Sequence, residues 1–262
     1  MTQVSEFKVE VLNIPLYARD IDSAVSVVLT KCSDKSTQNR CISATGAHGL
    51  VYSKKNPEFR QALLRFYLNL PDGMPGVWVG WMKGAKEMKR CYGPDFFKAM
   101  MISSKNSSVK HFFCGGNPGV AEDLKASVAK KFNNSNVVDV YCPPFLPIEK
   151  YDYGAIAEQI NNSKANVVWI GLSTPKQELF AMNLSQKTNV NFLITVGAAF
   201  DFHTDRIRQA PKLIQQAGLE WLFRLLGEPK RLYKRYLEVV PYFIYYNIVE
   251  LLKFATLKKN TP

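Results

Sequence analysis

Short apolar runs that alternate with segments of helical periodicity constrain the fold of this chain more than any other feature. As a group the runs are rich in β-branched residues, and the predicted strands are Arg40–Ala44, Lys110–Cys114, Val137–Tyr141, Asn166–Ile170 and Asn191–Val196. Strands that alternate with helices pair mostly in parallel, and the helices cover the sheet. The sequence therefore predicts an α/β fold with a Rossmann-like, mostly parallel sheet flanked by helices.

The sheet pattern ends near Asp205–Pro211, which is the one predicted boundary in the chain. Before it, Pro57–Leu70 and Gly119–Phe132 repeat apolar residues at helical spacing and are predicted helices. Beyond it, the chain is predicted to be helical to its C-terminus. We therefore expect two parts, an α/β core over residues 1–204 and a helical appendage over residues 205–262.

The appendage carries much of the positive charge of the chain, whose formal net charge is +12. Between Pro229 and Lys259, seven basic residues stand against two acidic ones, a net charge of +5. The apolar residues on one predicted helical face of this segment are Leu232, Tyr236, Val239, Val240 and Phe243. Such a basic amphipathic helix favours an anionic partner: a membrane surface, a phosphate-bearing ligand or nucleic acid.

Membrane-spanning and exported segments are not predicted. The apolar stretch Val239–Leu252 is 14 residues long and contains Pro241, Asn247 and Glu250, whereas a helix needs roughly 20 apolar residues to span a bilayer. Residues 1–10 contain no apolar run of signal-peptide length. The five cysteines are an odd number without a C-x-x-C pair and are expected to be reduced core residues. We expect a cytoplasmic protein whose appendage lies on the plasma membrane without crossing it.

Three loops of small residues each follow a predicted strand and precede a helix-like segment. The candidate ligand-binding residues in them are Gly115, Gly116 and Gly119, then Gly171, Ser173 and Lys176, then Gly197 and Asp201. Ligands of open α/β sheets bind at the carboxyl ends of the strands, and glycines let main-chain amides approach a phosphate. One such loop is equally typical of a plain strand-to-helix turn, but three together predict a site for a nucleotide-type ligand.

The segment Leu70–Gly73 has the composition of an ordinary turn, and a lone aspartate there is more often a turn former than a catalyst. Its Asp72 is flanked by apolar and aromatic residues, Met74 and Trp78 among them. Such surroundings desolvate a carboxylate and raise its pKa toward that of a useful general base. Asp72 is therefore the candidate base of the site.

Several motifs occur in one order along the chain. They are Leu-Pro-Asp-Gly at 70–73, Gly-Gly-Asn-Pro-Gly-Val-Ala at 115–121, Gly-Leu-Ser-Thr-Pro-Lys-Gln-Glu at 171–178, Phe-Asp-Phe at 200–202, Gln-Ala-Pro at 209–211, Gly-Leu-Glu-Trp-Leu-Phe-Arg-Leu at 218–225 and Glu-Pro at 228–229. As an ordered set, the motifs resemble the WecG/TagA/CpsF family of bacterial glycosyltransferases (glycosyltransferase family 26). The resemblance covers about residues 10–240.

The resemblance implies an inverting transferase that moves a sugar from a UDP-sugar to a polyprenyl-diphosphate-linked saccharide in surface or exopolysaccharide synthesis. It implies the inner face of the bacterial plasma membrane as the place of reaction, and neither a metal nor another cofactor. The base aspartate of the family falls on Asp72, and its helper residues fall on Thr45, Arg90 and Gln177.

Arginines of the appendage are candidates to stabilise the departing UDP. Arg224, Arg231 and Arg235 match basic positions in the tail of the family, and guanidinium groups suit bidentate contact with a diphosphate. The alternative is that they only hold anionic lipid, at about 1 kcal/mol each. Both roles are compatible with an appendage that docks on the membrane and completes the site.

Two segments differ from common glycosyltransferase patterns. Where the family often has Thr-x-Asn, this chain continues from Thr45 to His48 without the asparagine, so His48 is a candidate for the missing hydrogen bond or a structural residue. The D-x-D pattern Asp20–Asp22, which in many glycosyltransferases holds a metal, is predicted to cap a helix. No cluster of cysteine and histidine suggests a metal site.

Other classes of protein fit parts of the sequence. A non-catalytic membrane-surface scaffold of polysaccharide assembly shares the basic amphipathic appendage. A nucleic-acid-binding protein shares the charge, but the chain lacks the signatures of the common nucleic-acid-binding folds. An oxidoreductase is disfavoured because the dinucleotide fingerprint is missing. An exposed apolar face would also serve to form a homo-oligomer.

Overall fold

One sheet of eight strands organises the part of the chain that the computed structural model describes, residues 7–34, 36 and 38–259. In order across the sheet the strands are β1 (Lys8–Val11), β2 (Ile14–Tyr17), β4 (Leu68–Pro71), β3 (Arg40–Thr45), β8 (Phe192–Thr195), β7 (Val167–Gly171), β5 (His111–Gly115) and β6 (Val137–Tyr141). The β1–β2 pair is antiparallel, and the other neighbours are parallel. The predicted α/β fold with a mostly parallel sheet is confirmed.

All five predicted strands are confirmed, each within one residue at either end. Every residue of β5 and of β8 is buried, which is typical of parallel strands covered on both faces and explains why they are continuous apolar runs. The strands β1, β2 and β4 were not predicted. Each has four residues that include charged residues (Lys8 and Glu10), a proline (Pro15) or an asparagine (Asn69), so none stands out as an apolar run, whereas the equally short β8 does.

The predicted helix Pro57–Leu70 is wrong at its C-terminal end. Helix α3 (Pro57–Arg65) stops at Phe66, whose backbone is extended, and Leu68–Pro71 forms β4. All four residues of β4 are buried. Leu70 lies four residues after Phe66, so it continued the helical spacing of Phe59, Leu63 and Phe66 in the sequence.

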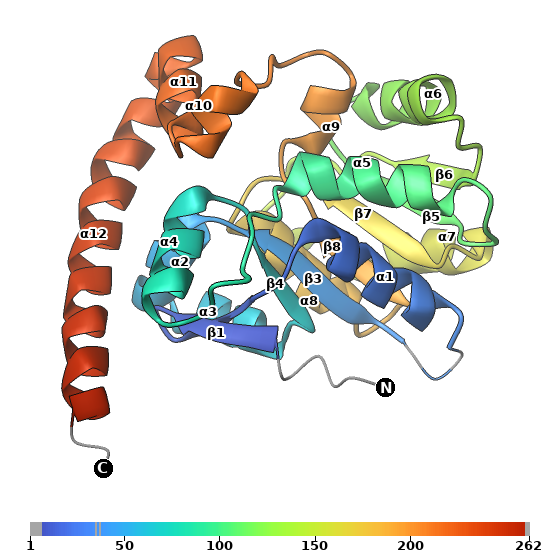
Figure 1. Cartoon of the computed structure of the whole chain (residues 1–262). Coiled ribbons are helices and arrows are strands. Elements are labelled where there is room, and N and C mark those ends of the chain that lie inside the picture. Colours follow the sequence, from blue (N-terminus) through green and yellow to red (C-terminus); the bar gives the residue numbers. More distant parts are fainter. Residues whose placement is uncertain (1–6, 35, 37, 260–262) are drawn as a thin grey trace.

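Helices cover both faces of the sheet, as Figure 1 shows. One apolar core lies between the sheet and the helices α1 (Ile21–Cys32), α5 (Gly93–Ser104), α6 (Val120–Phe132) and α9 (Ala199–His203). A second core lies between the sheet and α3, α7 (Tyr153–Ser163) and α8 (Lys176–Leu184), with the 3₁₀ helix η2 (Ile148–Lys150) beside α8. A third core joins the β1–β2 hairpin to α2 (Ala47–Lys55) and α4 (Met74–Met82).

The predicted helical appendage consists of α10 (Lys212–Gln216), α11 (Glu220–Gly227) and α12 (Pro229–Lys259). In Figure 1, α12 runs along the side of the molecule, and it packs against α2. Glu250 near its far end accepts a hydrogen bond from the main-chain N–H of Leu12 (2.9 Å) and pairs with Lys83 (3.1 Å). The helix is therefore fastened to the core along its length.

The apolar face that the sequence assigned to a membrane lies against the protein instead. Leu232, Val239 and Phe243 on that face are buried, the last two in the core shared with α2 and the β1–β2 hairpin. The expected role of this face at a membrane is therefore wrong. The physical reason is that α12 has a second apolar face, and helical periodicity does not say which of two faces meets the core. No helix in the described ranges has both the length and the apolar character needed to cross a membrane.

The cysteine prediction is confirmed for the core positions. All five cysteines are free thiols, and Cys41, Cys91 and Cys114 are buried, while Cys32 and Cys142 are partly exposed. Residues 1–6, part of the segment on which the expectation of no export signal depends, lie outside the described residues.

Candidate active site

The polar loops predicted from the sequence lie along the carboxyl edge of the sheet. Strands β4, β3, β8, β7 and β5 are consecutive and parallel, so the loops after them open at the same edge. Asp72 follows β4, Thr45 ends β3, Gly197 follows β8, and Gly171 and Gly115 end β7 and β5. The tertiary structure thus brings the three small-residue loops and Asp72 to one side of the molecule.

Asp72 is held by main-chain contacts on both sides. Its N–H donates to the carbonyl oxygen of Thr45 (3.2 Å), and its Oδ1 accepts the N–H of Gly93 (2.8 Å). A Cβ on Gly93 would lie only 3.1 Å from the carbonyl oxygen of Val196 and 3.4 Å from Oδ1, so a larger residue would crowd this contact. The Oδ2 atom faces Gly46, where an added Cβ would lie 3.6 Å away. Among the described residues, Oδ2 has no hydrogen-bond donor.

Burial raises the pKa of Asp72 to about 6. Arg90, the Gly93 N–H and Arg224 lower this pKa, and the carboxylate of Glu220 raises it further. Asp72 is only partly covered from solvent, yet protein atoms surround the carboxyl group densely enough for desolvation to dominate. A carboxylate with a free oxygen and a pKa near neutrality has the properties of a general base.

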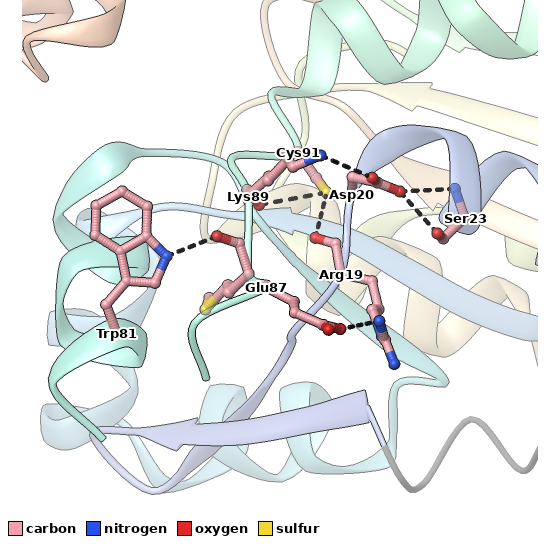
Figure 2. A network of polar contacts seen from close by, with 8 residues as sticks. Arg19, Asp20, Ser23, Trp81, Glu87, Lys89 and Cys91 are labelled. Atoms are coloured by element: carbon pink, nitrogen blue, oxygen red, sulfur yellow. Dashed lines mark hydrogen bonds and ion pairs between the residues drawn. The ribbon is translucent and has the colours of Figure 1, made fainter. Parts of the chain in front are cut away.

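The loop that carries Arg90 and leads to Gly93 at the start of α5 is anchored by the polar contacts shown in Figure 2, several of which involve Asp20. Asp20 caps α1 by accepting the N–H of Ser23 (3.1 Å), and it also pairs with Lys89 (3.2 Å). The Nε1 of Trp81 donates to the carbonyl oxygen of Met88 (2.8 Å). The predicted capping role of the D-x-D pattern is therefore confirmed for Asp20.

Arg90 joins the core to the appendage. Its Nε donates to the carbonyl oxygen of Asp72 (2.6 Å), its Nη1 to Gln215 of α10 (3.3 Å) and its Nη2 to Glu220 of α11 (2.5 Å). The guanidinium carbon lies 4.0 Å from the centre of the Tyr92 ring. The sequence missed Glu220 and Tyr92, although Glu220 lies inside one of the quoted motifs.

Gln177 lies at the start of α8 in a buried polar cluster. Its Oε1 accepts the N–H of Gly197 (3.0 Å), and its Nε2 donates to Oε1 of Glu178 (2.9 Å). The same Glu178 oxygen accepts from Ser43 (3.2 Å) and Thr174 (3.0 Å). Desolvation raises the pKa of Glu178. The cluster holds Gln177 against the loop after β8. Of the residues in this cluster, the sequence predicted only Gln177.

The glycine loops after β5 and β7 lie in direct contact. Gly116 donates its N–H to the carbonyl oxygen of Gly171 (3.0 Å), and a Cβ on Gly115 would lie 2.7 Å from that same oxygen. The φ angle of Gly115 is +133°, so both its conformation and its surroundings require glycine. Gly119, with φ +85°, leads directly into α6. Close backbone approach is what a phosphate-binding loop needs.

The remaining candidates on this edge differ in exposure. Ser173 is exposed, and Lys176 lies over the ring of the fully exposed Phe145, 4.3 Å from its centre. Thr45 is buried beside Asn69, with 3.5 Å between their side-chain oxygens. His48 lies in the first turn of α2, where burial and the charge of Arg235 lower its pKa to about 4. His48 is thus a neutral imidazole next to the appendage.

The three candidate arginines of the appendage lie close to the site elements. Arg224 is placed over Phe202 at 5.8 Å, and its Nε is buried without a partner among the described residues. Arg231 pairs with Glu228 through two hydrogen bonds of 2.6 and 2.7 Å. Arg235 lowers the pKa of His48. Burial raises the pKa of the half-buried Asp201, and Arg206, Arg231 and Arg224 counteract this rise.

Within the described ranges, no three side chains of histidine, cysteine, aspartate or glutamate come together as possible metal ligands. His203, the other histidine near these loops, bonds to the carbonyl oxygen of Pro94 (2.9 Å) and stacks on Phe97. Its contacts are those of a structural residue.

Comparison with known protein families gives a match. A family model described as the glycosyl transferase WecG/TagA/CpsF family matches residues 9–256, which include every residue of the candidate site.

Proposed function

The chain belongs to the WecG/TagA/CpsF family of glycosyltransferases, and we propose that it is an inverting, metal-independent enzyme with Asp72 as its base. As a glycosyltransferase it has a sugar donor and an acceptor. The proposed donor is a UDP-sugar, and the proposed acceptor is a polyprenyl-diphosphate-linked saccharide in surface or exopolysaccharide synthesis. The observation that carries the proposal is the Asp72 carboxyl group, which has one tethered oxygen, one free oxygen and a pKa near 6.

The proposed reaction is a single displacement. An acceptor hydroxyl oxygen attacks the anomeric carbon while the bond from that carbon to the UDP oxygen breaks. The hydroxyl proton passes to Oδ2 of Asp72, and the bonding electron pair leaves with UDP. Attack opposite the leaving group inverts the configuration at the anomeric carbon.

The other site residues are assigned by their place along the sheet edge. Main-chain amides of the loops at Gly115–Gly119, Gly171–Lys176 and Gly197 are proposed to hold the nucleotide diphosphate. Thr45, the neutral His48 and Gln177 are proposed to contact the sugar, and Asp201 is close enough to the tail arginines for their charges to lower its pKa. Arg224, Arg231 and Arg235 offset the charge that grows on the departing UDP. Arg90 holds the main chain at Asp72.

The exposed face of the appendage supports action at a membrane surface. Apolar side chains with large exposed fractions lie on all three appendage helices: Leu213 (80%), Leu226 (75%), Leu237 (72%) and Leu252 (65%). The exposed Lys234 lies three residues before Leu237 and is its helical neighbour, and the exposed Lys230 lies one turn before Lys234. Apolar contact combined with lysine suits an anionic lipid surface. We propose peripheral attachment of this face to the inner side of the plasma membrane.

The decisive experiment for the function is release of UDP from a panel of UDP-sugars with a polyprenyl-diphosphate saccharide as acceptor, with and without EDTA. Transfer in EDTA, with inverted configuration in the product, is the expected result. Absence of transfer with every donor, by a folded protein that binds the acceptor, would favour the scaffold alternative instead.

Membrane attachment is tested by sedimentation with vesicles of phosphatidylglycerol and phosphatidylcholine. Leu226→Asp together with Leu237→Asp is expected to abolish co-sedimentation, with RNA binding measured in parallel. Point substitutions are sharper here than truncation, because removing α12 would also uncover the apolar surface of α2. Vesicle binding that survives both substitutions, or stronger binding to RNA, would contradict the proposal.

A further inference from the structure

The guanidinium of Arg90 lies beside Asp72 but makes no hydrogen bond to its carboxylate. Its three nitrogens donate to the Asp72 carbonyl oxygen, to Gln215 and to Glu220. One face of the guanidinium is covered by the ring of Tyr92. An arginine next to an aspartate would ordinarily form a bidentate pair with it. Here the donors that such a pair requires are used elsewhere.

Two of those three contacts come from the appendage. Gln215 belongs to α10, where its own amide is fixed by a 2.7 Å hydrogen bond to the carbonyl oxygen of Ala210. Glu220 is the first residue of α11 and is 8% exposed. An ion pair buried to this extent is screened little by solvent. Two of the three hydrogen bonds that orient Arg90 therefore depend on the appendage.

We propose that Glu220 is a positioning residue: by binding Arg90 it keeps the guanidinium off the Asp72 carboxylate and so leaves Asp72 able to accept a proton. This inference rests on the proposed role of Asp72 as the base. Without Glu220, the guanidinium of Arg90 would be free to pair with the neighbouring Asp72 carboxylate, and such a pair would lower the Asp72 pKa and make Asp72 a weaker base. Docking of α10 and α11 on the core would thereby control the base as well as supply arginines.

Among the described residues, the charged and titratable groups with the largest effect on the Asp72 carboxyl group belong to the loop before α5 and to α11. Arg90, Cys91 and Tyr92 come from the loop before α5, and Glu220 and Arg224 come from α11. Cys91 and Tyr92 are neutral, because burial raises the pKa of both above the usual range. Arg224 opposes Glu220 in its effect on Asp72. Of these groups, Glu220 is the acceptor that binds a guanidinium nitrogen of Arg90.

The test is the titration of the Asp72 carboxyl carbon by ¹³C NMR in the full chain, with Asp72→Asn used for assignment. In Glu220→Gln the midpoint is expected to fall by at least about 1 pH unit, as for a carboxylate beside a free guanidinium. Glu87→Gln is the matched control, since it removes the carboxylate of another Arg–Glu pair, with Arg19, from the same loop. Its expected midpoint is that of the unsubstituted protein.

A double-mutant cycle shows whether Glu220 acts through Arg90. Glu220→Gln is expected to move the Asp72 midpoint less than half as far when Arg90→Gln is also present. An unchanged midpoint in Glu220→Gln would overturn the inference. An equal shift in both backgrounds would overturn it as well, because undocking of the appendage or direct repulsion by Glu220 would then be the cause.

Glycosyl transfer gives a second readout that separates this inference from the proposed function. In Glu220→Gln the acidic limb of the pH profile of kcat/KM is expected to move to lower pH together with the NMR midpoint, and Glu220→Asp to restore it. If no donor supports transfer while the NMR cycle behaves as expected, the proposed function fails and the placement of Arg90 by Glu220 stands.

Discussion

Two carboxyl groups at the carboxyl edge of the sheet have raised pKa values for the same reason, but they are presented differently. Asp72, after β4, gives one oxygen to the N–H of Gly93 and leaves the other without a donor among the described residues. Glu178, in the first turn of α8, is 1% exposed, and its Oε1 accepts three hydrogen bonds. A pKa raised by desolvation therefore does not show which of the two is the base. Asp72 is the better candidate because a substrate can reach one of its oxygens.

The first prediction sets the two carboxyl groups against each other. Asp72→Asn is expected to lower the transfer rate by about 10²–10⁴-fold, the range for loss of a general base, without loss of UDP binding. Glu178→Gln is expected to lower the rate by about tenfold or less, because it weakens only the hydrogen bond that positions Gln177. The transfer rates of both variants, and their affinities for UDP by titration calorimetry, test this prediction. A larger loss of rate in Glu178→Gln would reverse the comparison.

The second prediction concerns pH. Asp72 must be ionised to accept a proton, and burial sets its pKa at about 6, so kcat/KM is expected to be constant above this value. Below it the rate is expected to fall roughly tenfold for each pH unit. An acidic limb near pH 4 would mean that Asp72 in the working enzyme is more solvated or is paired with Arg90.

The third prediction concerns the free energy of unfolding. Of the two carboxyl groups, Glu178 is the one expected to stabilise the fold. Glu178→Ala leaves three donors, those of Ser43 and Gln177 buried and that of Thr174 part-buried, without their acceptor, and it is expected to lower the free energy of unfolding by about 1–3 kcal/mol in urea denaturation. Glu87→Ala, in an ion pair at the surface, is the control, with an expected cost below about 1 kcal/mol. An equal loss of unfolding free energy in the two variants would show that water reaches the Glu178 cluster.

The smallest effect on stability is expected at Thr195, which lies opposite Ser43 in the register of β8 and β3. Its Oγ1 and the Oε2 of Glu178 are both buried without a partner among the described residues. Thr195→Val keeps the shape and removes the unpaired hydroxyl, so the unfolding free energy is expected to change by less than about 1 kcal/mol, or to rise. A clear destabilisation in the same urea assay would mean that the hydroxyl has a partner, such as a bound water.

The local sequence was enough to predict the central strands and the three loops. A strand buried on both faces is a continuous apolar run, and a glycine-rich turn is a run of small residues, so each is visible in a few consecutive positions. Asp72 was found through an ordered set of motifs, since its own turn has an ordinary composition. Glu178 and Glu220 lie inside motifs that were quoted, yet nothing in the sequence marked them as acceptors for Gln177 and Arg90. Those contacts join residues 1 and 130 positions apart.

The sequence by itself determined the α/β class, the helical appendage and the family, because these depend on periodicity, composition and the order of motifs along one chain. The tertiary structure decided which face of α12 meets the core, which oxygen of Asp72 stays free and where the donors of Arg90 point. Each of these depends on groups that only folding brings together. Burial and hydrogen-bond partnership are properties of the packed chain, and here they separate a carboxylate available to a substrate from one that is closed to it.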